Sequence, residues 1–375
     1  MSSKSNMLGV LACLGILAST TALADEQVIL QVAPDVTKEG SLGWQGYIGA
    51  KVYFDDINVR GGVGGKQIKL LAVDQAGDIS AQVRDLVKQH NPVALFGTVG
   101  SAPVTKLISD KVLDNAQLPL VGPLTGSTAV ANDSKNAGFV FMTRPSYATE
   151  IDKVMRQFAT IGIKKMAVIY SESQTGHELL DLIKSTGAKQ GQSVEIALPE
   201  PKDPAKAAAL ADEVMTKEHQ AVLMAVPAET AAAFVKRYRQ QGGAAQLVAL
   251  SVVEGAQLAE LAGAKFAHGT AVVQVAPSPR NDSYAVVREF TTNYRKYGPY
   301  TEEPTEAMME GYLAAKVIVE GLKRGGGGRA ALARGVSQIS SYDAGGVSFG
   351  FTPASRSGAK YIELSVIDRE GRIVR

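Results

Sequence analysis

Two segments of the sequence place glycine, serine, threonine and proline directly after a short apolar run. The first reads FGTVGSAPV, in which Ser101 and Pro103 lead into a helical pattern. The second, LPLVGPLTGSTAV, repeats the arrangement with Thr125, Gly126 and Ser127. A helix start offers unpaired amides and partial positive charge, which suit a carboxylate, and glycine lets a ligand approach the backbone closely. Two such loops predict one polar corner for a ligand; plain helix capping is the alternative.

Two more loops of similar composition occur in the second half of the chain. They read SESQTGHELL, at 171–180, and LSVVEGAQL, at 250–258. The latter places the carboxylate of Glu254 just past an apolar strand pattern. This position predicts a counter-charge for a ligand ammonium group, and a solvated glutamate at a helix start is the alternative.

The sequence offers little for catalysis. Its histidines are scattered, and none pairs with another at metal-ligand spacing: His90, His177, His219 and His268. The G-x-S-x-G pattern of a serine hydrolase elbow occurs only as GVSFG, at 346–350, in a turn-rich segment and not between a strand and a helix. The segment RGGVGGKQ, at 60–67, has arginine where a phosphate loop begins with glycine, and it precedes a strand. We therefore expect no enzymatic activity, no metal and no cofactor.

Composition sets broad limits on the class of protein. The chain has 375 residues, of which 45% are hydrophobic and 20% charged, which is enough for about two globular domains. The formal net charge is +2, and no basic stripe alternates with aromatic residues. These features argue against a nucleic-acid-binding protein.

The first 24 residues predict a secretory signal peptide. A lysine-bearing start precedes a 12-residue apolar segment, MLGVLACLGILA, and the small-x-small sequence at 22–24 predicts cleavage after Ala24. The single cysteine, Cys13, lies inside this segment, where a lipidation site is the alternative. The mature chain would hold no cysteine and hence no disulfide. No other apolar run reaches the ~18 residues of a membrane span, so we expect a soluble, secreted mature protein.

Short apolar strand patterns alternate with amphipathic helical patterns along the rest of the chain. Strands are predicted at 27–33, 66–74, 93–97 and 118–122, separated by helices at 43–59, 79–90 and 102–116. The alternation restarts after 140–147, with strands at 164–170, 193–199, 221–226 and 246–251, separated by helices at 176–190, 205–217 and 229–241. A hairpin is predicted around 369–371. This order predicts an α/β fold with two doubly wound, three-layer halves.

The order of these motifs resembles the periplasmic substrate-binding proteins of ABC importers, in particular the leucine/isoleucine/valine-binding group. The resemblance is carried by GYIGAKVYFDDINVRGGVGGKQIKLLAVD, VALFGTVGSAPV, LPLVGPLTGST and KKMAVIYSESQTG, and it extends over the mature chain. It implies the type I periplasmic-binding fold, with two lobes joined by three hinge crossings. The first lobe would comprise 25–145 and 277–348, and the second 146–276 and 349–375.

The resemblance also implies the halves of a ligand site. Ser101 and the segment from Thr125 to Ser127 would hold a ligand carboxylate on the first lobe. Glu254 would hold an α-ammonium group on the second lobe.

The same resemblance implies residues around the rest of the pocket. Tyr147 at the first hinge, and Trp44 or Leu42 after the first strand, would line the rim or the pocket. The sequence departs from branched-chain binders at Thr175 and Val226, where that group tends to place tyrosines, so the pocket for the ligand side chain differs.

The resemblance implies a periplasmic receptor that closes its lobes over a small carboxylate-bearing solute, most simply a branched-chain or other amino acid. It also implies an inner-membrane ABC permease as the partner to which the solute is delivered. We expect a monomer. An aromatic acid, urea or a short amide stays open as the ligand. A sensor module for a signalling partner and a secreted enzyme are alternative functions.

Overall fold

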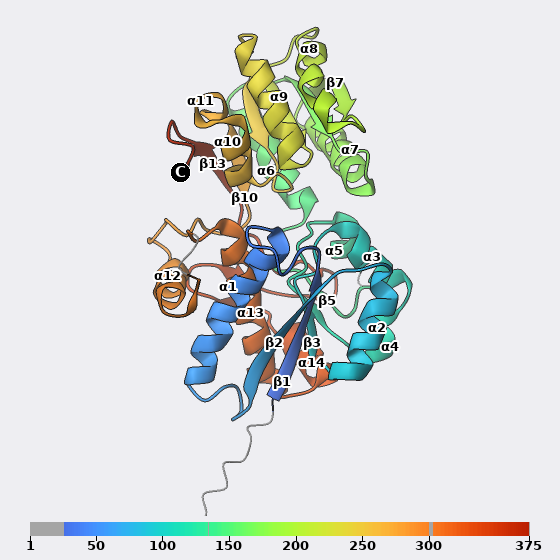
Figure 1. The fold of residues 1–375 in the computed structure, drawn as a ribbon. Helices are drawn as coiled ribbons and strands as arrows, with labels where there is room; N and C mark the ends of the chain where they lie inside the picture. Colours follow the sequence, from blue (N-terminus) through green and yellow to red (C-terminus); the bar gives the residue numbers. More distant parts are fainter. Residues whose placement is uncertain (1–25, 134, 300–302, 375) are drawn as a thin grey trace, which may run out of the picture.

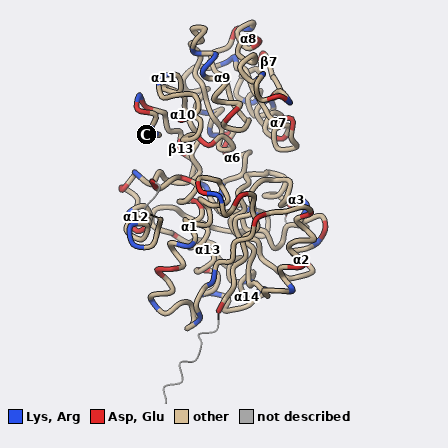
Figure 2. The backbone as a smooth tube through the Cα atoms, in the orientation of Figure 1, with Lys and Arg blue, Asp and Glu red and all other residues tan. Residues whose placement is uncertain are grey.

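The computed structural model describes residues 26–133, 135–299 and 303–374 as two α/β lobes (Figure 1). The predicted signal peptide, with its cleavage site and Cys13, lies outside the described residues. Within those residues, no helix combines the length and the apolar character needed to cross a membrane. Lysine, arginine, aspartate and glutamate are spread over both lobes (Figure 2).

The first lobe is built on a five-stranded parallel sheet in the order β2-β1-β3-β4-β5. Its strands are β1 Glu26–Ala33, β2 Gln67–Asp74, β3 Ala94–Phe96, β4 Leu120–Val121 and β5 Val140–Phe141. The intervening helices are α1 Leu42–Val59, α2 Ile79–His90, α3 Ser101–Ser109, α4 Val112–Ala116 and α5 Thr128–Asn132. The strand order reverses beside β1. In open α/β sheets, ligands bind at the carboxyl ends of the strands next to such a reversal.

The second lobe repeats the design with the order β14-β13-β10-β9-β8-β6-β7. Its parallel strands are β6 Lys165–Tyr170, β7 Ser193–Pro199, β8 Ala221–Ala225, β9 Gln246–Ala249 and β10 Ala271–Gln274. The antiparallel strands β13 Glu363–Ile367 and β14 Ile373–Val374 form the predicted terminal hairpin. Its helices are α6 Tyr147–Thr160, α7 Gln174–Lys189, α8 Leu210–Val214, α9 Ala228–Gln240, α10 Gly255–Ala262 and α11 Ala264–Ala267, together with the 3₁₀ helix η1 Pro204–Ala209.

The chain then returns to the first lobe. Three helices follow β10, and a short β-ribbon follows them: α12 Ala285–Tyr297, α13 Glu306–Gly325, α14 Arg329–Ser337, β11 Tyr342–Asp343 and β12 Ser348–Phe349. Helix α13 packs directly along α1 (Figure 1). The crossing needs glycine, because a methyl group on Gly49 would lie 1.9 Å from the carbonyl oxygen of Met308.

Two predicted helices are divided in the structure. The helix expected over 102–116 is broken into α3 and α4, because Lys111 adopts the left-handed conformation with φ 51°. The helix expected over 205–217 is a 3₁₀ segment followed by one short α-helix. The fold class, two doubly wound α/β lobes, is confirmed.

The lobe boundaries stay a proposal, with one adjustment. Phe349, Phe351 and Ala359 pack in the core cluster of the first lobe, and the backbone of Met142 pairs with Ser357. We therefore place the third crossing between 359 and 363 rather than at 348.

Candidate ligand-binding site

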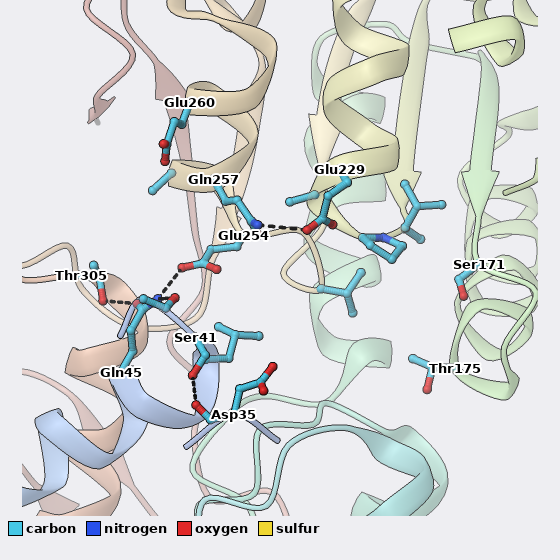
Figure 3. Close-up of a pocket in the computed structure, with 18 of the residues that line it drawn as sticks. Asp35, Ser41, Gln45, Ser171, Thr175, Glu229, Glu254, Gln257, Glu260 and Thr305 are labelled. Carbon is cyan, nitrogen blue, oxygen red and sulfur yellow. Dashed lines mark hydrogen bonds between the residues drawn. The ribbon is translucent and has the colours of Figure 1, made fainter. Parts of the chain in front are cut away.

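Two adjoining cavities lie between the lobes. The outer cavity has a volume of about 870 Å³ and the inner cavity about 250 Å³. Residues of both lobes line each of them, and five residues border both cavities: Leu42, Thr175, Val252, Glu254 and Ala256. Figure 3 shows the outer cavity with its polar side chains. A cleft of this size between two lobes is a typical place for a small-molecule ligand.

Ser101 lies at the start of α3 and lines the inner cavity. It follows Gly100, whose φ of 92° favours glycine and turns the chain from the end of β3 into the helix. The Ser101 hydroxyl is 2.6 Å from the hydroxyl of Thr125, which is fully buried. Thr125 therefore orients Ser101 and does not itself line either cavity.

The rest of the second predicted loop meets the opposite lobe instead of a cavity. The Ser127 hydroxyl donates to a carboxylate oxygen of Glu178 on α7 at 3.1 Å, and the Thr128 amide donates to its other oxygen at 2.5 Å. Gly126 packs on Tyr147, since an added methyl group would lie 2.6 Å from that ring. In this structure a protein carboxylate occupies the corner that the sequence predicts for a ligand carboxylate.

Glu254 is the residue immediately before α10, and its carboxylate lies where the two cavities meet. It accepts a hydrogen bond from the side-chain amide of Gln45, on α1 of the other lobe, at 3.2 Å (Figure 3). Gln45 in turn accepts one from the Thr305 hydroxyl. Burial raises the pKa of Glu254 above its ordinary value, with the Gln45 hydrogen bond opposing the rise. A half-buried carboxylate with a neutral partner is well suited to receive a cation.

A buried ionic network lies beside the inner cavity at the hinge. The guanidinium of Arg144 lies 2.9 Å from Glu310 of α13 and donates to the backbone oxygen of Ser251 at 3.3 Å. The amide and hydroxyl of Ser251 donate to Glu150, which is 1% exposed. Burial raises the pKa of both Glu150 and Glu310, and Arg144 opposes the rise in each. The network joins first-lobe residues to second-lobe residues.

The other predicted site residues divide between the cavities and the core. Leu42 is 40% exposed and borders both cavities, as does Thr175. Tyr147 lines the inner cavity, and Val226 lines the outer one. The predicted pocket role is wrong for Trp44. Its side chain lines neither cavity and packs in the first-lobe core. Two residues along a helix turn a side chain by about 200°, so Trp44 faces inward where Leu42 faces the cleft.

Four residues of the contacts described above were not predicted. Gln45, Arg144, Glu178 and Glu310 each connect segments far apart in sequence. Only Arg144 carried a local signal, as a cation directly after the apolar run VFMT. Among the residues that the structure describes, no group of three or more His, Cys, Asp or Glu side chains is arranged for a metal ion.

Comparison with known proteins gives both a family match and relatives. The family model for periplasmic binding proteins matches residues 32–370. A curated relative, an "Amino acid binding protein" of Pseudomonas aeruginosa, is 28% identical over 190 residues. That alignment covers 49% of this chain and 48% of the relative, so it spans about half the length of each.

Two solved structures are similar over nearly the whole chain. A substrate-binding periplasmic protein from Ralstonia solanacearum is 32% identical, with a TM-score of 0.84 covering 93% of this chain and 99% of that one. An extracellular ligand-binding receptor from Verminephrobacter eiseniae is 26% identical, with a TM-score of 0.85 covering 93% of this chain and 100% of that one.

Proposed function

The chain belongs to the periplasmic binding protein family, a family of binding proteins and not of enzymes, and from that premise we propose that it is a receptor for an amino acid held between its two lobes. The observation that carries this proposal is the position of Glu254. Its carboxylate lies where both cavities meet and has a neutral amide as its partner. A ligand ammonium at this point would supply the missing positive charge.

The ligand carboxylate has donors on the inner side of Glu254. The Ser101 hydroxyl lines the inner cavity at the start of the nine-residue helix α3, where backbone amides and the helix dipole favour an anion. Arg144 borders the same cavity. A zwitterionic ligand would thus contact Ser101 on one lobe and Glu254 on the other. The name of the Pseudomonas aeruginosa relative agrees with such a ligand.

Contacts with both lobes give the ligand a means of acting on the conformation. A ligand that binds the closed arrangement better than the open one shifts the population towards closure by that difference in affinity. We propose that the closed, ligand-loaded monomer is delivered in the periplasm to an inner-membrane ABC permease. The predicted signal peptide agrees with this location.

Calorimetric titration of the purified protein with the twenty amino acids tests the proposal. An amino acid is expected to bind, with affinity reduced roughly a hundredfold by Glu254→Ala, as for loss of one partner of a hydrogen-bonded charge pair, and about tenfold by Ser101→Ala. Ser109→Ala, at an exposed hydroxyl of the same helix α3, is the matched control.

The same titrations separate the alternatives. Binding of aromatic or aliphatic carboxylates that lack an amine, with no effect of Glu254→Ala, would overturn the amino-acid assignment while keeping Ser101 in the site. Capture of a signalling protein in place of a permease by the loaded receptor would assign it to sensing.

A further inference from the structure

The outer cavity is strongly acidic although the protein is not. Five carboxylates and one cation line it: Asp35, Glu39, Glu229, Glu254, Glu260 and Lys38. The whole chain has a formal net charge of +2. A cleft lined by one sign of charge concentrates the electric field and attracts ligands of the opposite sign. The negative charge of the outer cavity therefore favours a positively charged ligand.

These carboxylates come from both lobes. Asp35 and Glu39 lie on the first-lobe loop between β1 and α1, whereas Glu229 lies in the first turn of α9 and Glu260 on α10. Figure 3 shows Asp35 reaching the cavity from the first lobe, opposite Glu229 and Glu254 on the second. Closure of the lobes shortens the distances between the two groups. Without a cation between them, closure would be opposed by repulsion of like charges.

The positive charges of the protein do little to neutralise the five carboxylates of the outer cavity. Glu229 accepts a hydrogen bond from the amide of Gln257 at 3.1 Å, and Glu254 accepts one from Gln45. Within the described ranges, none of the five carboxylates forms an ion pair with lysine or arginine. The described residues also contain no cluster arranged for a metal ion. An extended organic cation fits this spread of charge better than a metal does.

We propose, building on the proposed function, that the ligand is an amino acid with a cationic side chain. Its α-ammonium group contacts Glu254 where the cavities meet, and its side chain runs outward so that the second positive charge lies between Asp35 and Glu229. The positions of Thr175 and Val226, which hold no large aromatic side chain, leave the outer cavity open to such a chain.

Matched ligand pairs isolate the side-chain charge. Arginine and citrulline have nearly the same shape and differ in charge, as do lysine and its Nε-acetyl derivative. Calorimetric titration is expected to show arginine or lysine binding about five- to tenfold more tightly than its neutral partner, as for two partly exposed ion pairs. The difference should shrink when the ionic strength rises from about 0.01 M to 1 M, because salt screens exposed charges.

Single substitutions then assign the preference to residues. Asp35→Asn and Glu229→Gln are each expected to reduce affinity for the cationic ligand by about two- to fivefold and to leave that for its neutral partner unchanged. Glu213→Gln, at an exposed carboxylate of α8 outside the cavities, is the control and should change neither.

The outcomes keep the inference and the proposed function distinct. Leucine or citrulline binding as tightly as arginine, with Glu254→Ala still reducing affinity roughly a hundredfold, would overturn the cationic side chain but keep the amino-acid receptor. The side chain of such an uncharged amino acid would then occupy the inner cavity, which is lined by several valines. Failure of every amino acid to bind would overturn both proposals.

Discussion

Ser127 of the first lobe donates a hydrogen bond to Glu178 of the second lobe at 3.1 Å, and the neighbouring amide of Thr128 donates to the same carboxylate. The two carboxylate oxygens of Glu178 thus meet the start of α5 as those of a ligand would. The contact joins the lobes directly. It turns a loop that was predicted to bind a ligand into part of the interface between the lobes.

Removing this contact should favour the open arrangement. Glu178→Ala deletes two hydrogen bonds to a charged group, which together contribute about 1–2 kcal/mol when partly solvated. The ratio of lobes in contact to lobes apart should fall roughly tenfold. Small-angle scattering of the ligand-free protein would then show a larger radius of gyration. Asp181→Ala, on the exposed side of the same helix, should leave it unchanged, and an unchanged radius in both variants would contradict the proposed role.

The same contact predicts an order of effects on ligand affinity. Because Ser127 faces Glu178 and Ser101 faces the inner cavity, Ser101→Ala should weaken amino-acid binding about tenfold and Ser127→Ala considerably less. Titrations of the two variants under identical conditions compare them. A larger loss for Ser127→Ala would mean that the ligand displaces Glu178 and takes its place.

Local sequence identifies residues whose position depends on their own element, and it misses residues whose contacts depend on a distant element. Glu254 was recognisable as a carboxylate directly after an apolar strand and before a helix. Glu178 could not be, because its partner lies 51 residues away on the other lobe. Gln45 and Glu254 are separated by 209 residues. The alternation of strands and helices fixes each sheet and its strand ends, whereas the relative placement of the lobes decides which side chains face one another.

Rotation about a helix axis accounts for the error at Trp44. A pocket role was predicted for Trp44 or Leu42, two residues apart after the first strand. The N-cap Ser41, which accepts a hydrogen bond from the Trp44 amide, fixes where α1 begins and therefore which of the two faces the cleft.

Acidification should weaken ligand binding through Glu254. Burial raises the pKa of this carboxyl in the free protein, and a ligand ammonium would lower it in the complex. Affinity is therefore full above the free-state pKa and falls as the pH decreases through it. The fall should begin at a higher pH than for an exposed glutamate. Titrations across the acidic range measure this, and Glu254→Gln should give weaker binding whose fall begins at a lower pH than in the wild-type protein.

The hinge network should be sensitive to loss of one partner. Arg144 and Glu310 have side chains 10% and 14% exposed and lie 2.9 Å apart. Glu310→Leu leaves the guanidinium buried with little compensation and should lower the free energy of unfolding by about 3–5 kcal/mol. The double substitution Arg144→Met with Glu310→Leu removes both charges and should recover most of the loss. Urea unfolding of the three proteins checks this, and equal losses in the single and double variants would contradict it.

The crossing of α1 and α13 should tolerate no side chain at its contact points. A methyl group on Gly311 would lie 2.2 Å from the carbonyl oxygen of Gly46, which is backbone and cannot rotate away. Gly311→Ala should therefore force the helices apart and cost about 1–3 kcal/mol or more, as overpacked cores do. Gly138→Ala is the control, because that glycine has open space around its Cα and no positive φ. Both helices carry site residues, Gln45 on α1 and Glu310 on α13. The folded fraction of the Gly311→Ala variant should thus bind ligand more weakly than the wild-type protein. Wild-type stability and affinity in this variant would show that the contact is not tight.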